Sequence, residues 1–242
     1  MYLEILCLTE NSRIFIPQPR QAPERYLQFK QHLSLIMNKS LLFFFLISLK
    51  LYCQDFEGKV EYKISYKVIS TKENEVNLKK DLGTKTTFIV KNGFYKEITD
   101  AEYMNYQLYN PKENRLYFTD KFTPKTLYFY RGQKLPNTKV EYKIIKNAET
   151  ILGHICDVLI YKTDKYEIAL YYSKDLKLNP EYFKNFTYLN RNKKAQIMKS
   201  IWLKQIITTK DYVATLKASK IIFAKISDSE FIKPQYDLLK EQ

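Results

Sequence analysis

The chain has 242 residues, with 40 Lys or Arg against 26 Asp or Glu and a formal net charge of +14. A basic balance suits anionic partners such as nucleic acid, anionic lipid or polysaccharide. The lysines alternate with apolar residues, however, as in Lys59–Ile64, which is typical of a sheet with one solvated face, so no nucleic-acid partner is predicted. Of the three cysteines, Cys156 alone is expected inside the folded domain, which argues against an intramolecular disulfide.

The first 36 residues hold Pro17, Pro19 and Pro23 among glutamines and arginines, without a periodicity that would bury one face. We therefore expect residues 1–36 to be a disordered extension, or upstream sequence translated from a mistaken start. Met37 is then the expected start of the protein.

Residues 37–53 have the pattern of a secretory signal peptide. Lys39 supplies a cationic n-region, and Leu41–Leu49 forms a nine-residue apolar h-region. We expect cleavage between Cys53 and Gln54. The mature domain, 54–242, would then have 189 residues and a net charge of about +11, because the first 53 residues carry six Lys or Arg and three Asp or Glu. Export to the periplasm, the outer membrane or the medium follows.

Two alternatives for this segment stay open. Cys53 is a candidate for lipidation, although Tyr52 is bulky where lipid-attachment motifs carry a small residue. An uncleaved anchor over Leu33–Leu49 would contain the polar residues Asn38–Ser40 in its middle. Its uninterrupted apolar run is also well short of the roughly 20 residues that cross a bilayer.

Alternation of apolar and polar residues predicts strands through most of residues 54–242. The charged segment 70–83 predicts a loop or a short exposed helix. Asn92-Gly93 lies between two alternating runs and predicts a hairpin, because both central residues of such a turn take positive φ. The predicted strands are 60–68, 86–90, 94–98, 104–109, 115–119, 125–130, 138–146, 151–162, 166–173, 196–208 and 212–225.

One short helix is predicted at 179–184, with Asn179 as its cap, Pro180 in the first helical position and Glu181 in the first turn. A tail with Pro234 follows the last strand and closes on Asp237–Leu239. Many strands joined mainly by short turns predict a mainly β fold, in which a curved antiparallel sheet forms an incomplete half-barrel with one or two short helices.

Three short motifs carry a resemblance to a known family: Ile151–Val158, Tyr171–Leu176 and Ile226–Pro234, with a first strand that begins at Phe56. They resemble the exported GLPGLI type and its lipoprotein-carrier-like (LolA-like) relatives of Gram-negative envelopes. The stretch after Tyr182 lacks the glycine-leucine-proline run that names the type, so a neighbouring branch fits better.

The resemblance implies a curved, incomplete β-barrel with an apolar concave face that helices or loops cover, and it implies no established catalytic activity. It also implies structural roles for four residues. Gly153 would lie where a strand bends or another backbone approaches, and Cys156 would be a small buried thiol. The other two, Phe231 and Pro234, belong to the last motif.

His154 and Cys156 lie two apart on a predicted strand and would face the same side, as two metal ligands do. The other histidine, His32, precedes the predicted signal peptide. A third ligand and an orienting group are both missing, so no metal, cofactor or catalytic site is predicted.

The remaining candidates have ordinary structural interpretations. The strand carboxylates are expected to be solvent-facing charges, and Trp202 is expected in the core rather than on a binding platform. Alternation alone would also place two tyrosines on one face near two cations, which is the layout of a nucleic-acid or glycan surface. These residues are Glu57, Glu61, Asp157 and Glu167 for the carboxylates, and Tyr128, Tyr130, Lys125 and Arg131 for the surface.

A curled sheet with aromatic residues on its concave side must either fill that space with its own side chains or admit a ligand. We expect a non-catalytic protein that binds a lipid or lipoprotein tail there. The alternative is a structural module that contacts other envelope proteins through an exposed apolar patch or sheet edge. The sequence sets no oligomeric state.

Overall fold

The fold is seen in the part of the chain that follows the predicted signal peptide. A computed structural model describes residues 55–133, 140–163 and 165–242, which belong to one compact unit, Gln54–Gln242. Cys53 and Gln54, where cleavage and lipidation are predicted, lie outside the described residues, as do the residues before them. Signal peptide, cleavage and lipidation therefore stay predictions.

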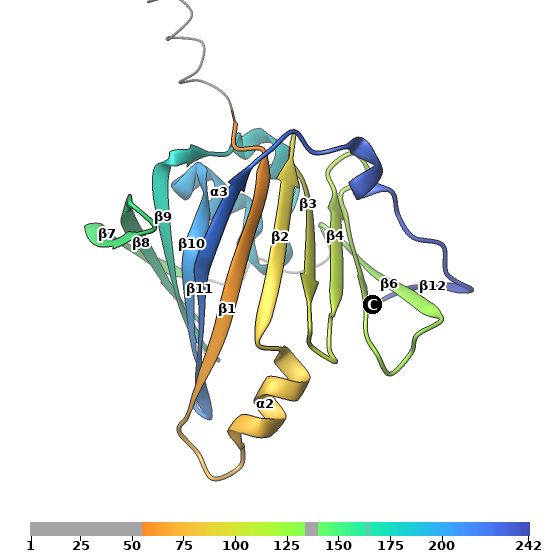
Figure 1. The fold of residues 1–242 in the computed structure, drawn as a ribbon, viewed down its shortest axis with the longest axis horizontal. Coiled ribbons are helices and arrows are strands. Elements are labelled where there is room, and N and C mark those ends of the chain that lie inside the picture. The colour runs from red at the N-terminus through yellow and green to blue at the C-terminus, as the bar shows by residue number, and fades with distance from the viewer. Residues whose placement is uncertain (1–54, 134–139, 164) are drawn as a thin grey trace, which may run out of the picture. The chain divides into compact units, whose positions relative to one another are not determined.

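Twelve strands make up a single sheet in the described part of the chain (Figure 1). Their order is β12-β6-β5-β4-β3-β2-β1-β11-β10-β9-β8-β7, and neighbours are antiparallel except β12, which runs parallel to β6. The bounds are β1 Gly58–Val68, β2 Lys85–Lys91, β3 Phe94–Thr99, β4 Tyr106–Asn110, β5 Arg115–Thr119, β6 Thr126–Arg131, β7 Glu141–Ile151, β8 His154–Lys162, β9 Glu167–Lys177, β10 Ser200–Thr208, β11 Tyr212–Phe223 and β12 Leu238–Glu241.

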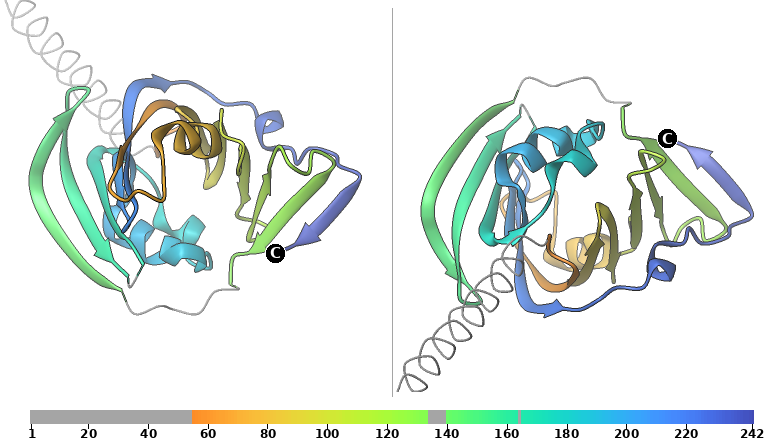
Figure 2. Two further views of the ribbon diagram at one scale, coloured as in Figure 1. Left: turned by 90° about the horizontal axis from the view of Figure 1, so that it is seen from below. Right: turned by 90° about the horizontal axis from the view of Figure 1, so that it is seen from above.

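The sheet curves strongly and does not close. Figure 2 shows β7–β10 on one side and β4–β6 on the other, with helical turns between them inside the curve. These turns are the 3-10 helices η1 (Pro180–Phe183) and η2 (Tyr188–Asn190) and the helix α3 (Arg191–Met198). The predicted fold class, a curved and incomplete barrel with two short α-helices, is confirmed.

The alternation in β1 decides which side chains face the inside of the curve. Val60 and Tyr62 are buried, whereas Lys63 and Lys67 are exposed on the other face. β1 pairs with β2 on one side and with β11 on the other. The strand is therefore held at the centre of the sheet with its lysines in water.

Capping residues place the predicted helices. The side chain of Asn74 accepts the N–H of Asn77 at 2.8 Å and starts α2 (Glu75–Leu82), so the helix alternative for 70–83 is the right one. The side chain of Asn179 accepts the N–H of Glu181 at 3.0 Å and starts η1, which confirms the predicted short helix in 3-10 form. A third 3-10 helix, η3, spans Asp228–Phe231.

Several strand predictions were wrong at their boundaries, including 138–146 and 166–173, which continue to Ile151 and Lys177, and two others have a clear local cause. The strand predicted over 151–162 begins at His154, because Leu152 and Gly153 form the turn from β7 with φ of 50° and 84°. The strand predicted over 196–208 begins at Ser200, because α3 occupies the preceding residues. The Asn92-Gly93 hairpin is confirmed, with φ of 48° and 80°.

The C-terminal segment covers the outer face of one part of the sheet. Ile89 points away from the inner face and packs in a second core with Ile226 and Phe231. Two hydrogen bonds to the backbone of Ile226 fix this segment. Lys91 Nζ donates to the carbonyl of Ile226 at 2.6 Å, and the N–H of Ile226 donates to Glu57 Oε1 at 2.6 Å. One solvated face was predicted for the strands, but β2 is buried on both faces.

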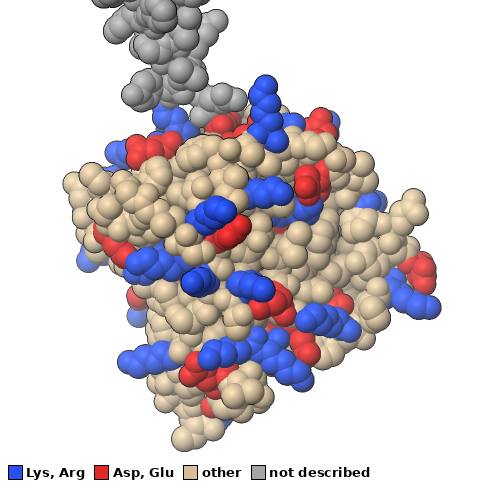
Figure 3. Space-filling model, viewed as in Figure 1, with Lys and Arg blue, Asp and Glu red and all other residues tan. Residues whose placement is uncertain are grey.

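Basic and acidic side chains are interspersed on the face that Figure 3 shows, rather than gathered in one basic patch. Several oppositely charged side chains of the protein form ion pairs, including Lys59 with Glu230 and Lys80 with Glu102. Mixed charges of this kind keep a sheet face solvated.

Asp157 was predicted to be a solvent-facing charge, and this was wrong. Its carboxylate is buried at a bulge where the register between β7 and β8 shifts. One oxygen accepts Lys146 Nζ at 2.8 Å and the other accepts the N–H of Asn147 at 3.1 Å. Burial alone would raise the pKa of Asp157, but these two contacts hold it below its usual range. The carboxylate therefore fixes an irregular backbone.

Asp157→Asn is expected to lower the free energy of unfolding by about 1 kcal/mol at pH 7, because it removes a charged acceptor of two hydrogen bonds. A carboxyl with a lowered folded-state pKa stabilises the protein above its unfolded pKa and loses that effect as pH falls through the folded value. The difference between wild type and variant should thus shrink as pH falls below the unfolded-state pKa of about 3.9. Urea unfolding followed by Trp202 fluorescence checks this, and a difference that stays constant with pH would contradict it.

Candidate ligand cavity

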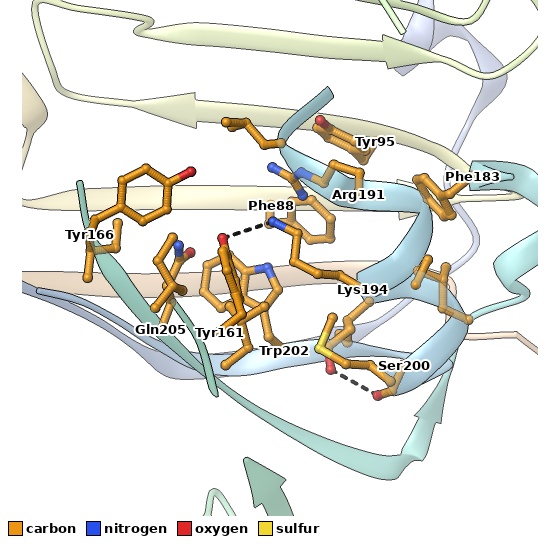
Figure 4. A pocket seen from close by; sticks show the side chains of 18 residues that line it. Phe88, Tyr95, Tyr161, Tyr166, Phe183, Arg191, Lys194, Ser200, Trp202 and Gln205 are labelled. Carbon is orange, nitrogen blue, oxygen red and sulfur yellow. Dashed lines mark hydrogen bonds between the residues drawn. The ribbon is translucent and has the colours of Figure 1, made fainter. Parts of the chain in front are cut away.

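A cavity of about 290 Å³ lies inside the curve of the sheet, under the helical turns (Figure 4). One wall comes from β2 and β3, the opposite wall from β8, β9 and β10, and the roof from residues 178–198. The lining is mainly apolar and aromatic, and includes Phe88, Ile168, Leu170, Phe183, Met198 and Trp202. An apolar cavity of this size is suited to an organic ligand.

The middle of the roof is bonded to Gly132, the residue that follows the end of β6. The N–H groups of Thr187 and Tyr188 donate to the carbonyl of Gly132 at 2.7 and 3.0 Å. Leu189 and Asn190 then take left-handed φ of 51° and 55°, which turns the chain so that α3 starts at the next residue. This local geometry directs the first turn of α3 over the cavity.

Two cationic side chains enter the cavity from α3. Arg191 and Lys194 are three residues apart and so share one face of the helix. Lys194 is 7% exposed, and its Nζ donates to the hydroxyl of Tyr161 at 3.1 Å and lies 4.8 Å from the centre of that ring. The guanidinium of Arg191 lies 5.3 Å from the centre of the Tyr95 ring. Both cations therefore rest on aromatic groups inside the protein.

The surroundings shift the pKa values of the two side chains in opposite directions. Burial and the neighbouring Arg191 bring the pKa of Lys194 well below its usual range. Burial also disfavours the charged form of Arg191, but Tyr95 and Glu97 outweigh burial and raise its pKa. Arg191 stays charged, while Lys194 releases its proton more readily than a lysine in water.

Trp202 forms the floor of the cavity. Its carbonyl accepts the hydroxyl of Tyr62 at 2.7 Å, and the two rings lie 4.3 Å apart between centroids. Trp202 was expected in the core, and it packs against core residues while one side of the ring lines the cavity.

The four residues singled out by resemblance lie apart from the cavity. Gly153 is in the β7–β8 turn, where no atom lies within 4 Å of the place that a Cβ would occupy, so its positive φ rather than a close backbone explains it. Cys156 is buried in the main core. Phe231 packs on the outer face against Phe94, and Pro234 is half-buried in the loop before β12.

His154 and Cys156 do not form a site with a third group. His154 Nδ1 lies 3.2 Å from a carboxylate oxygen of Asp175, and Cys156 Sγ donates to the carbonyl of His154 at 3.4 Å. Burial raises the pKa of the Cys156 thiol, which keeps it protonated. Within the described ranges, no group of three or more His, Cys, Asp or Glu side chains is placed to hold a metal ion.

The tyrosines considered as a stacking surface are occupied by the protein itself. Phe118 stacks on both Tyr128 and Tyr130, and Tyr130 also stacks on Tyr188 of the roof at 4.6 Å. The nearby cations pair with the C-terminal segment, since Arg131 bonds to Glu241 at 3.0 Å and Lys125 lies 3.8 Å from Asp237. Alternation along a strand accounts for this layout.

A second hollow, of about 820 Å³, lies between the Asn92-Gly93 turn, Pro111 and the residues around Tyr182. Its charged residues include Lys91, which is already bonded to Asp228 at 2.7 Å. The cavity under α3 is the smaller of the two, but it contains buried charge and a mainly apolar wall.

Sequence reasoning missed Arg191 and Lys194. They lie in a polar run, Asn190–Lys194, that was assigned to no element. The spacing of 191, 194, 195 and 198 fits one helix face, but cations at two of these positions hide the pattern that would predict a buried face.

Among the described residues, the helices are too short or too polar to span a membrane. No protein-family model matches the sequence, and the search of curated proteins gives no match. The fold can be superposed on a structure of PNGF-II in space group P21 with a TM-score of 0.41 and 11% sequence identity, over 76% of this chain and 31% of PNGF-II. A likeness this weak carries no inference about function.

Proposed function

We propose that the protein binds an apolar ligand, a lipid or the acyl tail of a lipoprotein, inside the curve of its sheet, and that it does so without catalysis. The observation that carries the proposal is the cavity of about 290 Å³ under α3, with its mainly apolar lining. Pockets for small ligands usually have about 300–1,000 Å³ and a few polar groups among apolar walls. At about 290 Å³ this cavity lies just below that range.

The proposal includes export to the cell envelope. It is supported by the sequence pattern of residues 37–53 and by the likeness of three motifs to exported lipoprotein-carrier-like proteins. Intact-mass measurement of the protein recovered from its cells checks it. A start at Gln54 or a lipid-modified Cys53 is expected, whereas an unprocessed chain that keeps residues 37–53 would contradict it.

The alternative is a structural module that contacts other envelope proteins through an exposed apolar patch or a sheet edge, and the β7 edge argues against pairing of that edge. β7 lies at one end of the strand order, but a register shift between Ile145 and Glu149 interrupts it. Asn147 takes a positive φ of 52° there, and Lys146 lies beside it. Bulges and lysines are the usual means by which edge strands avoid pairing.

Binding can be measured with N-phenyl-1-naphthylamine, an uncharged probe whose fluorescence rises in apolar sites. We expect saturable binding of one probe per protein. Ile207→Trp should weaken it by about tenfold or more, because Ile207 lines the cavity and a larger side chain would occupy it.

Ile155→Trp is the matched control, because Ile155 lies on β8 but is 61% exposed and does not line the cavity. It should leave probe binding unchanged. Urea unfolding of both variants separates blocked binding from lost structure. Equal binding by the folded wild type and the folded Ile207→Trp variant would contradict the proposal.

A further inference from the structure

We propose that the ligand carries an acidic headgroup, a carboxylate or a phosphate, which binds inside the cavity between Arg191, Lys194 and the hydroxyl of Tyr95. This inference rests on the proposed function and narrows it, because a neutral acyl tail alone would leave the polar end of the cavity unused. The shared chemistry of the two headgroups is a set of anionic oxygens at the end of an apolar chain.

The first observation is that positive charge is concentrated at one end of an apolar cavity. Figure 4 shows Arg191 and Lys194 extending from α3 into the space between Tyr95 and Tyr161. Burying a cation is costly unless an opposite charge or hydrogen bonds compensate for it. Two cations on one helix face also repel each other.

The second observation is that the protein supplies little negative charge in return. Glu97 on β3 is the carboxylate that interacts with Arg191, but the two are not within ion-pair distance, and no described carboxylate pairs with Lys194. Glu97 instead accepts a bond from the hydroxyl of Thr86 at 3.4 Å, and burial raises its pKa. Lys194 is therefore buried beside a second cation without a carboxylate partner among the described residues, and Arg191 has Tyr95 and Glu97 nearby but no ion pair.

The third observation is a pair of hydrogen-bonding atoms without partners. Tyr95 is 1% exposed, lines the cavity, and has a hydroxyl with no bond to any described residue. Arg191 Nε is likewise buried and unpaired in the described part of the chain. Buried polar atoms are nearly always hydrogen-bonded in folded proteins, so unpaired ones need an explanation.

One anionic headgroup would answer all three observations. Its oxygens would accept the N–H groups of Arg191, the ammonium of Lys194 and the hydroxyl of Tyr95, which are the charge-assisted bonds that bind carboxylates and phosphates best. The chain of the ligand would then lie along the apolar lining toward Ile168 and Leu170, which also face the cavity.

The test compares four ligands with the same twelve-carbon chain: laurate, dodecyl phosphate, dodecanol and dodecyltrimethylammonium. Each is titrated below its micelle concentration against bound N-phenyl-1-naphthylamine, and its displacement of the probe is measured. We expect laurate or dodecyl phosphate to bind at least about tenfold more tightly than dodecanol, because the headgroup gains charge-assisted bonds. The better of the two identifies the headgroup.

Lys194→Met keeps the length of the side chain and removes the charge. It should abolish the preference of the protein for the acid over the alcohol, measured as the ratio of the two dissociation constants. Lys193→Met is the control, because Lys193 is the exposed neighbour on the same helix and should leave the preference intact. Since Lys194→Met leaves the Tyr161 hydroxyl without its bond, the double variant with Tyr161→Phe is measured as well.

The outcomes separate this inference from the proposed function. Equal binding of all four ligands, or tighter binding of the cationic one, would overturn the acidic headgroup and leave an apolar-ligand protein. Failure of every ligand and of the probe to bind would overturn both. An acid preference that survives in folded Lys194→Met and in the double variant would also overturn the headgroup site.

Discussion

Gly93→Ala is expected to destabilise the protein by about 2–5 kcal/mol, whereas Gly153→Ala should cost only about 1–2 kcal/mol. Both glycines have similar left-handed backbones, with φ of 80° and 84°, so alanine meets a similar backbone penalty of about 1–2 kcal/mol at either place. They differ in their surroundings. A Cβ at Gly93 would overlap the Cβ of Tyr182, while at Gly153 nothing lies within 4 Å.

The contact at Gly93 joins two parts that are far apart in sequence. Tyr182 belongs to η1 in the roof of the cavity, and Gly93 is the tip of the β2–β3 hairpin. An added methyl group must push one of them away, and overpacking of this kind costs about 1–3 kcal/mol in addition to the backbone penalty.

Urea unfolding of the two variants measures the difference directly. Because both substitutions are Gly to Ala in a hairpin turn, effects on the unfolded chain largely cancel between them. Equal losses of stability would mean that the hairpin tip and the roof are not in close contact. N-phenyl-1-naphthylamine binding should also fall in Gly93→Ala alone, since the displaced roof covers the cavity.

Turn chemistry explains why one hairpin was predicted and the other was not. Asn-Gly is the preferred pair for the two left-handed positions of a tight hairpin, and Asn92-Gly93 was readable for that reason. Leu152 occupies the same position before Gly153 with a φ of 50°, although leucine rarely takes it. Propensity therefore favoured a continuous strand from Ile151, and pairing between β7 and β8 overrode it.

The fold class was predictable because alternation recurs in nearly every strand, as in Val60–Tyr66 of β1. What alternation could not predict is the second covered face. Ile89 follows Phe88 and precedes Val90, so β2 reads as a run of three apolar residues. Such a run is typical of a strand buried on both sides, but the partner that covers it, Ile226–Phe231, lies over 130 residues away.

The candidate site was not predictable, and the reason is physical. On α3 the positions that face the protein hold Arg191, Lys194, Ala195 and Met198, so charge stands where a helix of a simple core would be apolar. Binary patterning fails at these residues. Sequences break local rules most often where function requires it, which is consistent with a role for the two cations in binding.

Phe186→Ala is expected to lower the free energy of unfolding by about 3–5 kcal/mol, the usual cost of deleting a buried phenyl ring. Phe186 is 0% exposed, and its ring stacks on that of Tyr109 with centroids 4.1 Å apart and planes 9° apart. It lies between η1 and η2 and joins the roof of the cavity to β4. Its removal should also weaken binding of N-phenyl-1-naphthylamine, because the roof would no longer be held over the apolar lining.

Phe122→Ala serves as the matched control. Phe122 is 56% exposed, and the centroid of its ring lies 4.9 Å from that of another exposed ring, Tyr103. Its removal should therefore lower the free energy of unfolding by less than about 1 kcal/mol and leave probe binding intact. Urea titration and probe titration of the two variants give both quantities. Similar stabilities would show that Phe186 is not a packed anchor. If Phe186→Ala is destabilised but binds the probe as tightly as the wild type, probe binding does not depend on the roof, and the ligand binds elsewhere on the sheet.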